Sequence, residues 1–240
     1  MSGALYEGKS KIICRGPDEG SLVIRYKDTA TAFDGRKKED LAGKGRLNAA
    51  ISNLIYGYLA EHGIETHLIK VLDETSALVK KAEIVMVEVI VRNVAAGSFS
   101  KKYGIAEGTA LKNTTCEFSL KSDELGDPMI NESQITAIGL ASAEELAEMT
   151  RQALRVNELL GGLLAKAGVR LIDFKLEFGR CGGRIILCDE ISPDSCRFWE
   201  AGTDKKLDKD RFRRDLGNVL DGYRDVLGRL EGVLENPAAR

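Results

Sequence analysis

The sequence has few of the residues that build zinc sites or disulfide frameworks. Its 240 residues include only two histidines, His62 and His67, and their five-residue separation does not place them on one helical face. The five cysteines are scattered without a Cys-x-x-Cys pair, at positions 14, 116, 181, 188 and 196. This pattern is typical of reduced thiols in the cytoplasm. We therefore expect any bound metal to be a hard cation that carboxylates hold.

Long apolar runs and a strong net charge are also lacking. No apolar run approaches the roughly 20 residues that a membrane-spanning helix needs, and the first residues do not resemble a signal peptide. The formal net charge of -2 gives the protein no overall electrostatic attraction to nucleic acid or to an anionic membrane. With 43% hydrophobic and 30% charged residues, the chain is expected to be a soluble cytoplasmic protein acting on small molecules.

The first part of the chain is predicted to be rich in strands. Short β-type runs alternate with turns that contain glycine or proline. They cover residues 5–7, 11–14, 22–26, 67–72, 77–81 and 84–94. A helix is predicted for residues 47–61, because apolar side chains recur there at helical spacing and Gly63 follows.

The later part is predicted to hold two long helices and a hairpin. One helix starts at Ser142, where Glu145 completes a capping box, and runs to about residue 166. The other starts near Asp208 and continues with one apolar side as far as Leu230. The hairpin covers residues 171–191. Because the predicted strands come early in the chain and the helices cluster late, we predict an α+β fold. We divide it into an antiparallel β-rich lobe, 1–83, and a larger α+β lobe, 84–240.

Residues 3–10, GALYEGKS, match the phosphate-loop pattern G-x-x-x-x-G-K-[ST]. That loop needs a strand before it and a helix after it, whereas Lys-Ile-Ile-Cys follows Ser10 and favours a strand. We therefore interpret Gly8 as the turn of a hairpin over a nucleotide, with Lys9 and Lys11 supplying positive charge. An ordinary surface turn with solvated lysines remains an alternative.

The hairpin is the strongest candidate for a metal site. Strict alternation places Ile172, Phe174, Leu176 and Phe178 on one face, and Asp173, Lys175 and Glu177 on the other. A three-residue loop at residues 182–184 would place Glu177 opposite Asp189. Two opposed carboxylates repel each other, and Mg²⁺ between them would remove the repulsion. The alternatives are a solvated outer face or a different register.

Three further segments are candidates for binding anions. An irregular loop at residues 190–197 carries Ser, Asp and Arg beside the hairpin. Arg92 ends an apolar strand and is followed by small residues and Ser98, which suits phosphate at a helix start. A solvent-exposed strand-end arginine is the alternative. Residues 121–128 form an acidic turn whose simplest interpretation is a loop.

Together these segments resemble the phosphoribosylaminoimidazole-succinocarboxamide synthase (SAICAR synthetase) family nearly end to end. The motifs are VRNVAAGS at 91–98, DFKLEFG at 173–179, DEISPDSCR at 189–197 and DKDRFRRDLG at 208–217. Four blocks in order are more specific than any one of them. The resemblance implies two lobes distantly like those of a protein kinase, with ATP in the cleft. It also implies a homodimer.

The resemblance further implies a reaction and a role for each matching residue. ATP and Mg²⁺ would join the carboxylate of carboxyaminoimidazole ribonucleotide to the amine of L-aspartate through an acyl phosphate. ATP or its metal would contact Lys9, Ser10, Lys11, Ile13, Leu22, Lys81, Glu177 and Asp189, the last two as magnesium ligands. Substrate would contact Asp34, Arg92, Ser98, Lys121, Asp127, Arg197 and Arg213. Lys175 would lie at the reacting carboxylate, with Asp173 in support.

Two positions depart from the family pattern. Phe33 stands where many relatives carry glycine, which makes the placement of Asp34 less secure. Gly126 stands where many carry histidine, so no histidine acts there, whereas Asp127 keeps its candidate role. The remaining rival functions are another ATP-dependent ligase for a phosphorylated acid and a non-catalytic nucleotide-binding module.

Overall fold

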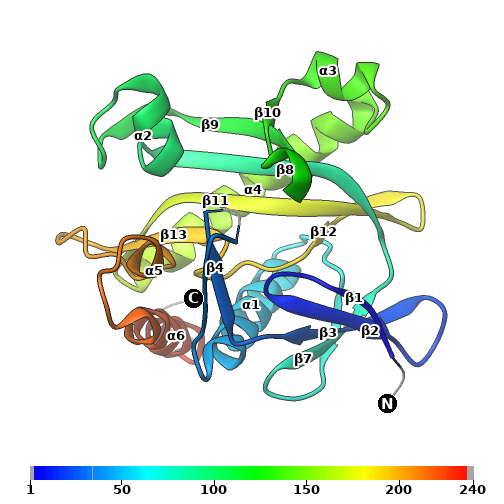
Figure 1. Cartoon of the computed structure of the whole chain (residues 1–240), viewed down its shortest axis with the longest axis horizontal. Helices are drawn as coiled ribbons and strands as arrows, with labels where there is room; N and C mark the ends of the chain where they lie inside the picture. The colour runs from blue at the N-terminus through cyan, green and yellow to red at the C-terminus, as the bar shows by residue number, and fades with distance from the viewer. Residues whose placement is uncertain (1–2, 34, 237–240) are drawn as a thin grey trace.

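The computed structural model describes residues 3–33 and 35–236, which form two main antiparallel sheets and a group of helices (Figure 1). The first sheet has the strand order β1-β2-β3-β7-β6. Its strands are β1 (Ala4–Glu7), β2 (Lys11–Arg15), β3 (Ser21–Tyr26), β7 (Ser76–Lys80) and β6 (Leu68–Val71). A separate small ribbon pairs β4 (Thr29–Ala32) with β5 (Lys37–Asp40).

The second sheet has six strands in the order β10-β9-β8-β11-β12, with β13 paired to one end of β11. They are β8 (Glu83–Val94), β9 (Ala110–Leu120), β10 (Met129–Ile130), β11 (Val169–Cys181), β12 (Arg184–Cys188) and β13 (Cys196–Glu200). An isolated bridge from Thr66 to Leu187 connects β12 to the segment before β6. The fold is therefore α+β with antiparallel sheets, as predicted.

Three long helices and several short ones accompany the sheets. The long helices are α1 (Lys44–Glu61), α4 (Ala143–Lys166) and α6 (Val219–Leu234). The short ones are α2 (Gly97–Tyr103), η1 (Asp123–Leu125), α3 (Glu132–Ala137) and α5 (Asp210–Arg213). The predicted capping box is confirmed, since Ser142 and Glu145 exchange side-chain and backbone hydrogen bonds at the start of α4. No helix in the described ranges is long and apolar enough to cross a membrane.

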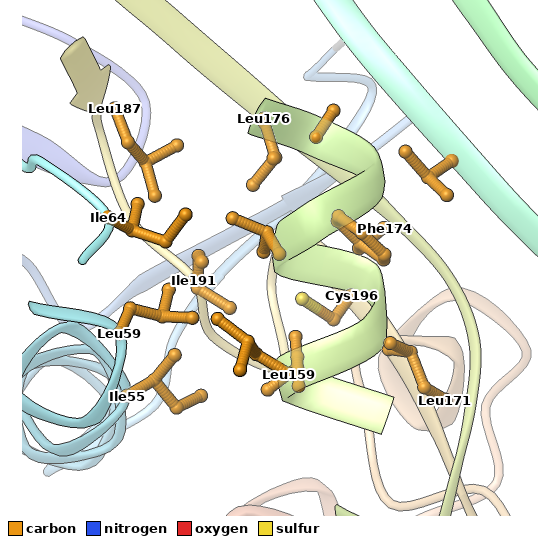
Figure 2. Close-up of a cluster of buried hydrophobic side chains, with 14 of the residues drawn as sticks. Ile55, Leu59, Ile64, Leu159, Leu171, Phe174, Leu176, Leu187, Ile191 and Cys196 are labelled. Atoms are coloured by element: carbon orange, nitrogen blue, oxygen red, sulfur yellow. The ribbon is translucent and has the colours of Figure 1, made fainter. Parts of the chain in front are cut away.

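The main hydrophobic core lies between the six-stranded sheet and the three long helices. Figure 2 shows Leu159 of α4 among Phe174 and Leu176 of β11, with Ile55 and Leu59 of α1 in the same cluster. Thus α1, although it comes from the first 83 residues, packs into the core of the later part of the chain. The lobe boundary at residue 83 remains a prediction, and it does not separate two independent cores.

The predicted single helix from Asp208 to Leu230 is wrong. The chain forms α5 and α6 with a break between them, where Asp215, Gly217 and Asn218 all have positive φ values of 54°, 67° and 47°. A right-handed helix cannot continue through left-handed residues. The apolar spacing continued across the break, so periodicity alone did not reveal it.

The predicted face of the hairpin is correct except at Ile172. A register shift between Leu171 and Asp173 in the pairing of β11 with β13 changes the alternation. Leu171 joins Phe174 in the main core, and Ile172 packs against Trp199 in a smaller cluster. A bulge of this kind leaves one extra residue in a strand and reverses the faces beyond it.

Candidate active site

A cavity of about 600 Å³ lies between the two sheets. Strands β2, β3 and β7 of the first sheet line one wall, and β8, β11 and β12 line the other. Ten of the residues predicted to form the site line this cavity. They are Lys9, Ser10, Lys11, Ile13, Leu22, Lys121, Asp127, Lys175, Glu177 and Asp189. Segments up to about 180 residues apart in sequence thus meet at one place.

One part of the cavity is apolar. Ile13, Leu22, Ile24 and Val79 come from the first sheet, and Met86 faces them from β8. Such a surface suits a flat ring with few polar groups.

Lys81 was predicted to contact the nucleotide, but its side chain does not line the cavity. It is exposed, and its backbone N–H donates to the Gly20 carbonyl at 2.7 Å. Its neighbours Lys80 and Ala82 line the cavity instead.

The hairpin of β1 and β2 covers another part of the cavity. Strand β2 begins at Lys11, directly after Ser10, so the phosphate-loop pattern lies in a strand-turn-strand segment, as interpreted from the sequence. Lys9 Nζ lies 2.7 Å from Asp123 Oδ1 at the surface. Lys11 is buried and contacts both Asp189 and Glu190, the latter at 3.3 Å. Burial alone would lower the pKa of Lys11, but these two carboxylates raise it above its usual value.

The predicted register of the acidic hairpin is wrong by one residue. The turn contains two residues, Gly182 and Gly183, both with positive φ, and Glu177 pairs with Cys188. Two-residue turns of this kind match the twist of the flanking strands. Asp189 follows β12 with a φ of 65°, a left-handed conformation that aspartate tolerates better than most residues. Its carboxylate therefore lines the cavity with Glu177, although the two residues are not directly opposed.

The two carboxylates differ in electrostatic environment. Burial, together with the charge of Asp189, raises the pKa of Glu177, and Lys121 and Lys175 oppose this effect from 2.6 and 3.8 Å. Burial would also raise the pKa of Asp189, but Lys11 lowers it to about 2. Glu177 is thus harder to ionise than an ordinary glutamate, first because it is buried and second because of Asp189, and a bound cation would favour its charged form.

The residues present fit a magnesium ion. Within the described ranges no group of three or more His, Cys, Asp or Glu side chains has the arrangement of a complete metal site. Mg²⁺, however, is commonly held by one or two carboxylates, with water and substrate phosphates as the other ligands. Glu177 and Asp189 supply hard oxygen donors of that type at the cavity wall.

Glu88 is a cavity residue that the sequence analysis missed. It lies on β8 directly opposite Glu177, is buried, and accepts a hydrogen bond from Ser119 Oγ at 3.0 Å. Its other carboxylate oxygen contacts Lys175 Nζ. Burial lowers the pKa of Lys175, but Glu177 and Glu88 raise it above its usual value. A glutamate inside the apolar run 84–94 was the signal available in the sequence.

A second group of charges lies at the junction of β8, β11 and β13. Asp173 accepts from Arg92 at 3.0 Å and from Arg197 at 2.8 and 3.0 Å. Asp210 accepts from Arg197 at 3.0 Å and from Arg213 at 2.7 Å. The structure therefore brings together the three predicted arginines and Asp173, the last as a partner of arginines and not as a lining residue of the cavity.

Ser98 lies beside this group, exposed in the first turn of α2. This turn can approach the Arg197 guanidinium group because residue 97 is a glycine. A Cβ atom built at Gly97 would stand 2.3 Å from Arg197 Nη2. Asp127 accepts from the backbone N–H of Ser122 at 2.9 Å and lines the cavity, whereas Asp34 lies outside the described residues.

Known proteins match this chain along nearly all of its length. A family model described as SAICAR synthetase matches residues 4–230. The phosphoribosylaminoimidazole-succinocarboxamide synthase of Shouchella clausii (strain KSM-K16) is 53% identical over 230 residues, which cover 95% of this chain and 96% of that protein.

Solved structures agree with the sequence match. The synthase of the same name from Ehrlichia chaffeensis has a TM-score of 0.93 at 42% identity, covering 95% of this chain and 98% of that one. A SAICAR synthetase in complex with ADP has a TM-score of 0.92 at 46% identity, covering 95% and 97%. The chain therefore belongs to the SAICAR synthetase family, ligases of purine biosynthesis.

Proposed function

We propose that this protein is an ATP- and magnesium-dependent ligase. It joins the carboxylate of 5-amino-1-(5-phosphoribosyl)imidazole-4-carboxylate to the amino group of L-aspartate, giving SAICAR, ADP and phosphate. The observation that carries the proposal is the cavity in which Lys11, Lys175, Glu177 and Asp189 meet below the β1–β2 hairpin. The ADP complex of a relative at 46% identity supports the nucleotide part of it.

The apolar part of the cavity would receive the adenine ring, against Ile13 and Leu22. The phosphates would then extend toward the hairpin, where Lys9, Ser10 and Lys11 lie. Glu177 and Asp189 would hold magnesium, which when bound supplies charge neutralisation for the phosphate oxygens. Phosphoryl transfer depends mainly on such positioning and electrostatics, so histidine or cysteine nucleophiles are not needed.

The cationic side chains account for the chemistry of a carboxylate substrate. A carboxylate is a poor electrophile, and transfer of the terminal phosphoryl group of ATP would convert it to an acyl phosphate. The amine would then attack the acyl carbon, with phosphate as the leaving group. Lys175, anchored by Glu88, would neutralise the carboxylate during the transfer, and Lys121 would assist from the same wall.

The arginine group would bind the 5′-phosphate of the ribonucleotide. Arg92 and Arg197 are held by Asp173, so their guanidinium groups are oriented before substrate arrives. Ser98 lies in the adjacent turn of α2 and would donate a hydroxyl group. Arginine forks match phosphate oxygens in a bidentate manner.

The decisive experiment measures ADP release with the ribonucleotide and L-aspartate supplied separately and together. Release only when both are present supports the ligase. Release with neither would indicate a simple ATPase, and nucleotide binding without release would indicate a sensor. From the family resemblance we also propose that the protein is a cytoplasmic homodimer. Sedimentation of the purified protein would test whether it is a dimer.

A further inference from the structure

Helix α1 carries four buried polar side chains on one side. They follow one another at intervals of four residues, which places neighbours in the series on the same face of a helix. They are Lys44, Asn48, Ser52 and Tyr56, and each is at most 2% exposed. Burying a polar group costs free energy unless it finds a polar partner. This face of α1 therefore needs polar partners in the part of the protein that it packs against.

Two of these side chains bind the backbone of the segment that follows β12. The Tyr56 hydroxyl donates to the Cys188 carbonyl at 2.7 Å. One turn earlier in α1, Ser52 Oγ accepts from the Ile191 backbone N–H at 3.2 Å. Both bonds are made in the interior, where a hydrogen bond to a backbone group is costly to lose. Helix α1 thus holds this segment at two points.

The two bonds flank Asp189. This residue has a φ of 65°, a left-handed conformation that costs free energy for a residue with a Cβ atom. Such a conformation persists only where the surrounding structure fixes it. The Cys188 carbonyl directly precedes Asp189, and the Ile191 N–H comes two residues after it. Tyr56 and Ser52 therefore restrain the backbone on both sides of the left-handed residue.

Neighbouring groups support this arrangement. The His67 ring meets the Tyr56 ring edge-on, with 5.6 Å between the centroids, and the His67 backbone N–H donates to the Leu187 carbonyl at 2.8 Å. Burial lowers the pKa of His67 to about 4, so the ring is neutral at pH 7 and does not repel a cation in the cavity. Farther along the segment, Asp194 Oδ2 lies 2.6 Å from Lys44 Nζ of α1.

We propose that Tyr56 and Ser52 are positioning residues for the magnesium ligand Asp189, and that they act through the backbone on either side of it. The inference rests on the proposed function, because that function assigns Asp189 to magnesium. Groups that orient a ligand raise the affinity for its metal, since the ligand is already in the binding conformation. The metal site would then depend on a helix from the first 83 residues as well as on the β11–β12 hairpin.

The test measures the binding of Mn²⁺, a paramagnetic substitute for Mg²⁺, in the presence of ADP by electron paramagnetic resonance. Tyr56→Phe removes the hydroxyl and keeps the ring. It should raise the dissociation constant of Mn²⁺ about fivefold, the factor that one buried hydrogen bond typically contributes. Tyr58→Phe removes the hydroxyl of a half-buried tyrosine on another side of α1 and should leave the constant unchanged. An unchanged constant in Tyr56→Phe overturns the inference.

A second comparison separates positioning from general stability. Ser52→Ala removes the other bond and should also raise the Mn²⁺ dissociation constant. Ser142→Ala weakens the cap of α4, a helix that does not line the cavity, and should leave this constant within twofold. An equal rise in Ser142→Ala would show that loss of stability is responsible, and would overturn the inference.

Hydrogen exchange tests the positioning in the metal-free protein. Loss of the Tyr56 hydroxyl should loosen the whole segment, so the Ile191 N–H should exchange about fivefold faster in Tyr56→Phe, as measured by NMR. The same rate in Tyr56→Phe and in the unaltered protein contradicts the inference. In the activity assay, Tyr56→Phe should need more Mg²⁺, yet its kcat at saturating Mg²⁺ should return to within twofold of the unaltered enzyme. A kcat that excess Mg²⁺ does not restore would also contradict it.

The two levels of the proposal fail differently. If the unaltered enzyme forms no aspartate-dependent product, the proposed function fails. If it forms that product and Tyr56→Phe binds Mn²⁺ as tightly as the unaltered protein, only the positioning role of α1 fails.

Discussion

Removing the charge of Asp189 and removing that of Glu177 should have different effects on the free energy of unfolding, although both residues are assigned to magnesium. In Asp189→Asn the buried Lys11 loses its main partner. The pKa of Asp189 is lowered from 3.8 to about 2, roughly two units, and each unit corresponds to about 1.36 kcal/mol of differential stability. Asp189→Asn should therefore lower the free energy of unfolding at pH 7 by about 2 kcal/mol.

The sign follows from the direction of the shift. A carboxyl group with a lowered pKa stabilises the fold above its unfolded pKa of 3.8, and this stabilisation is lost as pH falls through about 2. Glu177 has a raised pKa, because burial and the charge of Asp189 disfavour its ionised form. Glu177→Gln should therefore leave the free energy of unfolding at pH 7 unchanged or higher.

Urea unfolding at pH 7 measures both effects. The single tryptophan, Trp199, is 1% exposed and reports unfolding by its fluorescence. Both variants should lose at least about 100-fold in kcat, the typical effect of removing one group that stabilises transferring charge. Equal destabilisation by the two variants would refute the electrostatic reasoning. Near-normal magnesium-dependent activity in either one would refute the metal assignment.

Three further predictions concern positions outside this pair. Arg197→Ala should raise the KM for the ribonucleotide at least about tenfold, since one charge-assisted phosphate contact is lost. A change confined to the KM for ATP would show the phosphate assignment to be wrong. Gly97→Ala should lower the free energy of unfolding by about 1–2 kcal/mol, because φ is +54° and the new Cβ atom would meet Arg197. The same denaturant titration measures it, and an unchanged midpoint would contradict the contact. Ser142→Ala should cost about 1 kcal/mol through loss of the α4 cap while kcat stays constant. A fall in kcat would contradict a purely structural role for this cap.

Local patterns were sufficient to predict several elements. The capping box at Ser142 and Glu145 located the start of α4, because those hydrogen bonds are made within one turn of helix. The β-branched run after Ser10 distinguished a strand from the helix of a phosphate loop. Alternation placed Lys175 and Glu177 on the face opposite to Phe174 and Leu176, as is found.

Other features depended on backbone conformations that the residue types permit but do not dictate. The left-handed residues between α5 and α6, such as Asn218, interrupt a continuous apolar pattern. The turn at Gly182 and Gly183 has two residues where three were predicted, which moves every pairing in the hairpin by one. Register is set jointly by the turn and by packing on both faces, so neither strand determined it alone.

The sequence by itself determined the α+β class, the family and ten of the residues that line the cavity, because strand periodicity, caps and ordered motifs are local properties of the chain. Only the tertiary structure decided how those residues are paired. It assigned Asp173 to two arginines, Glu88 to Lys175 and Asp194 to Lys44. These contacts join segments between 24 and 150 residues apart, and their strength depends on burial and distance, which no local pattern contains.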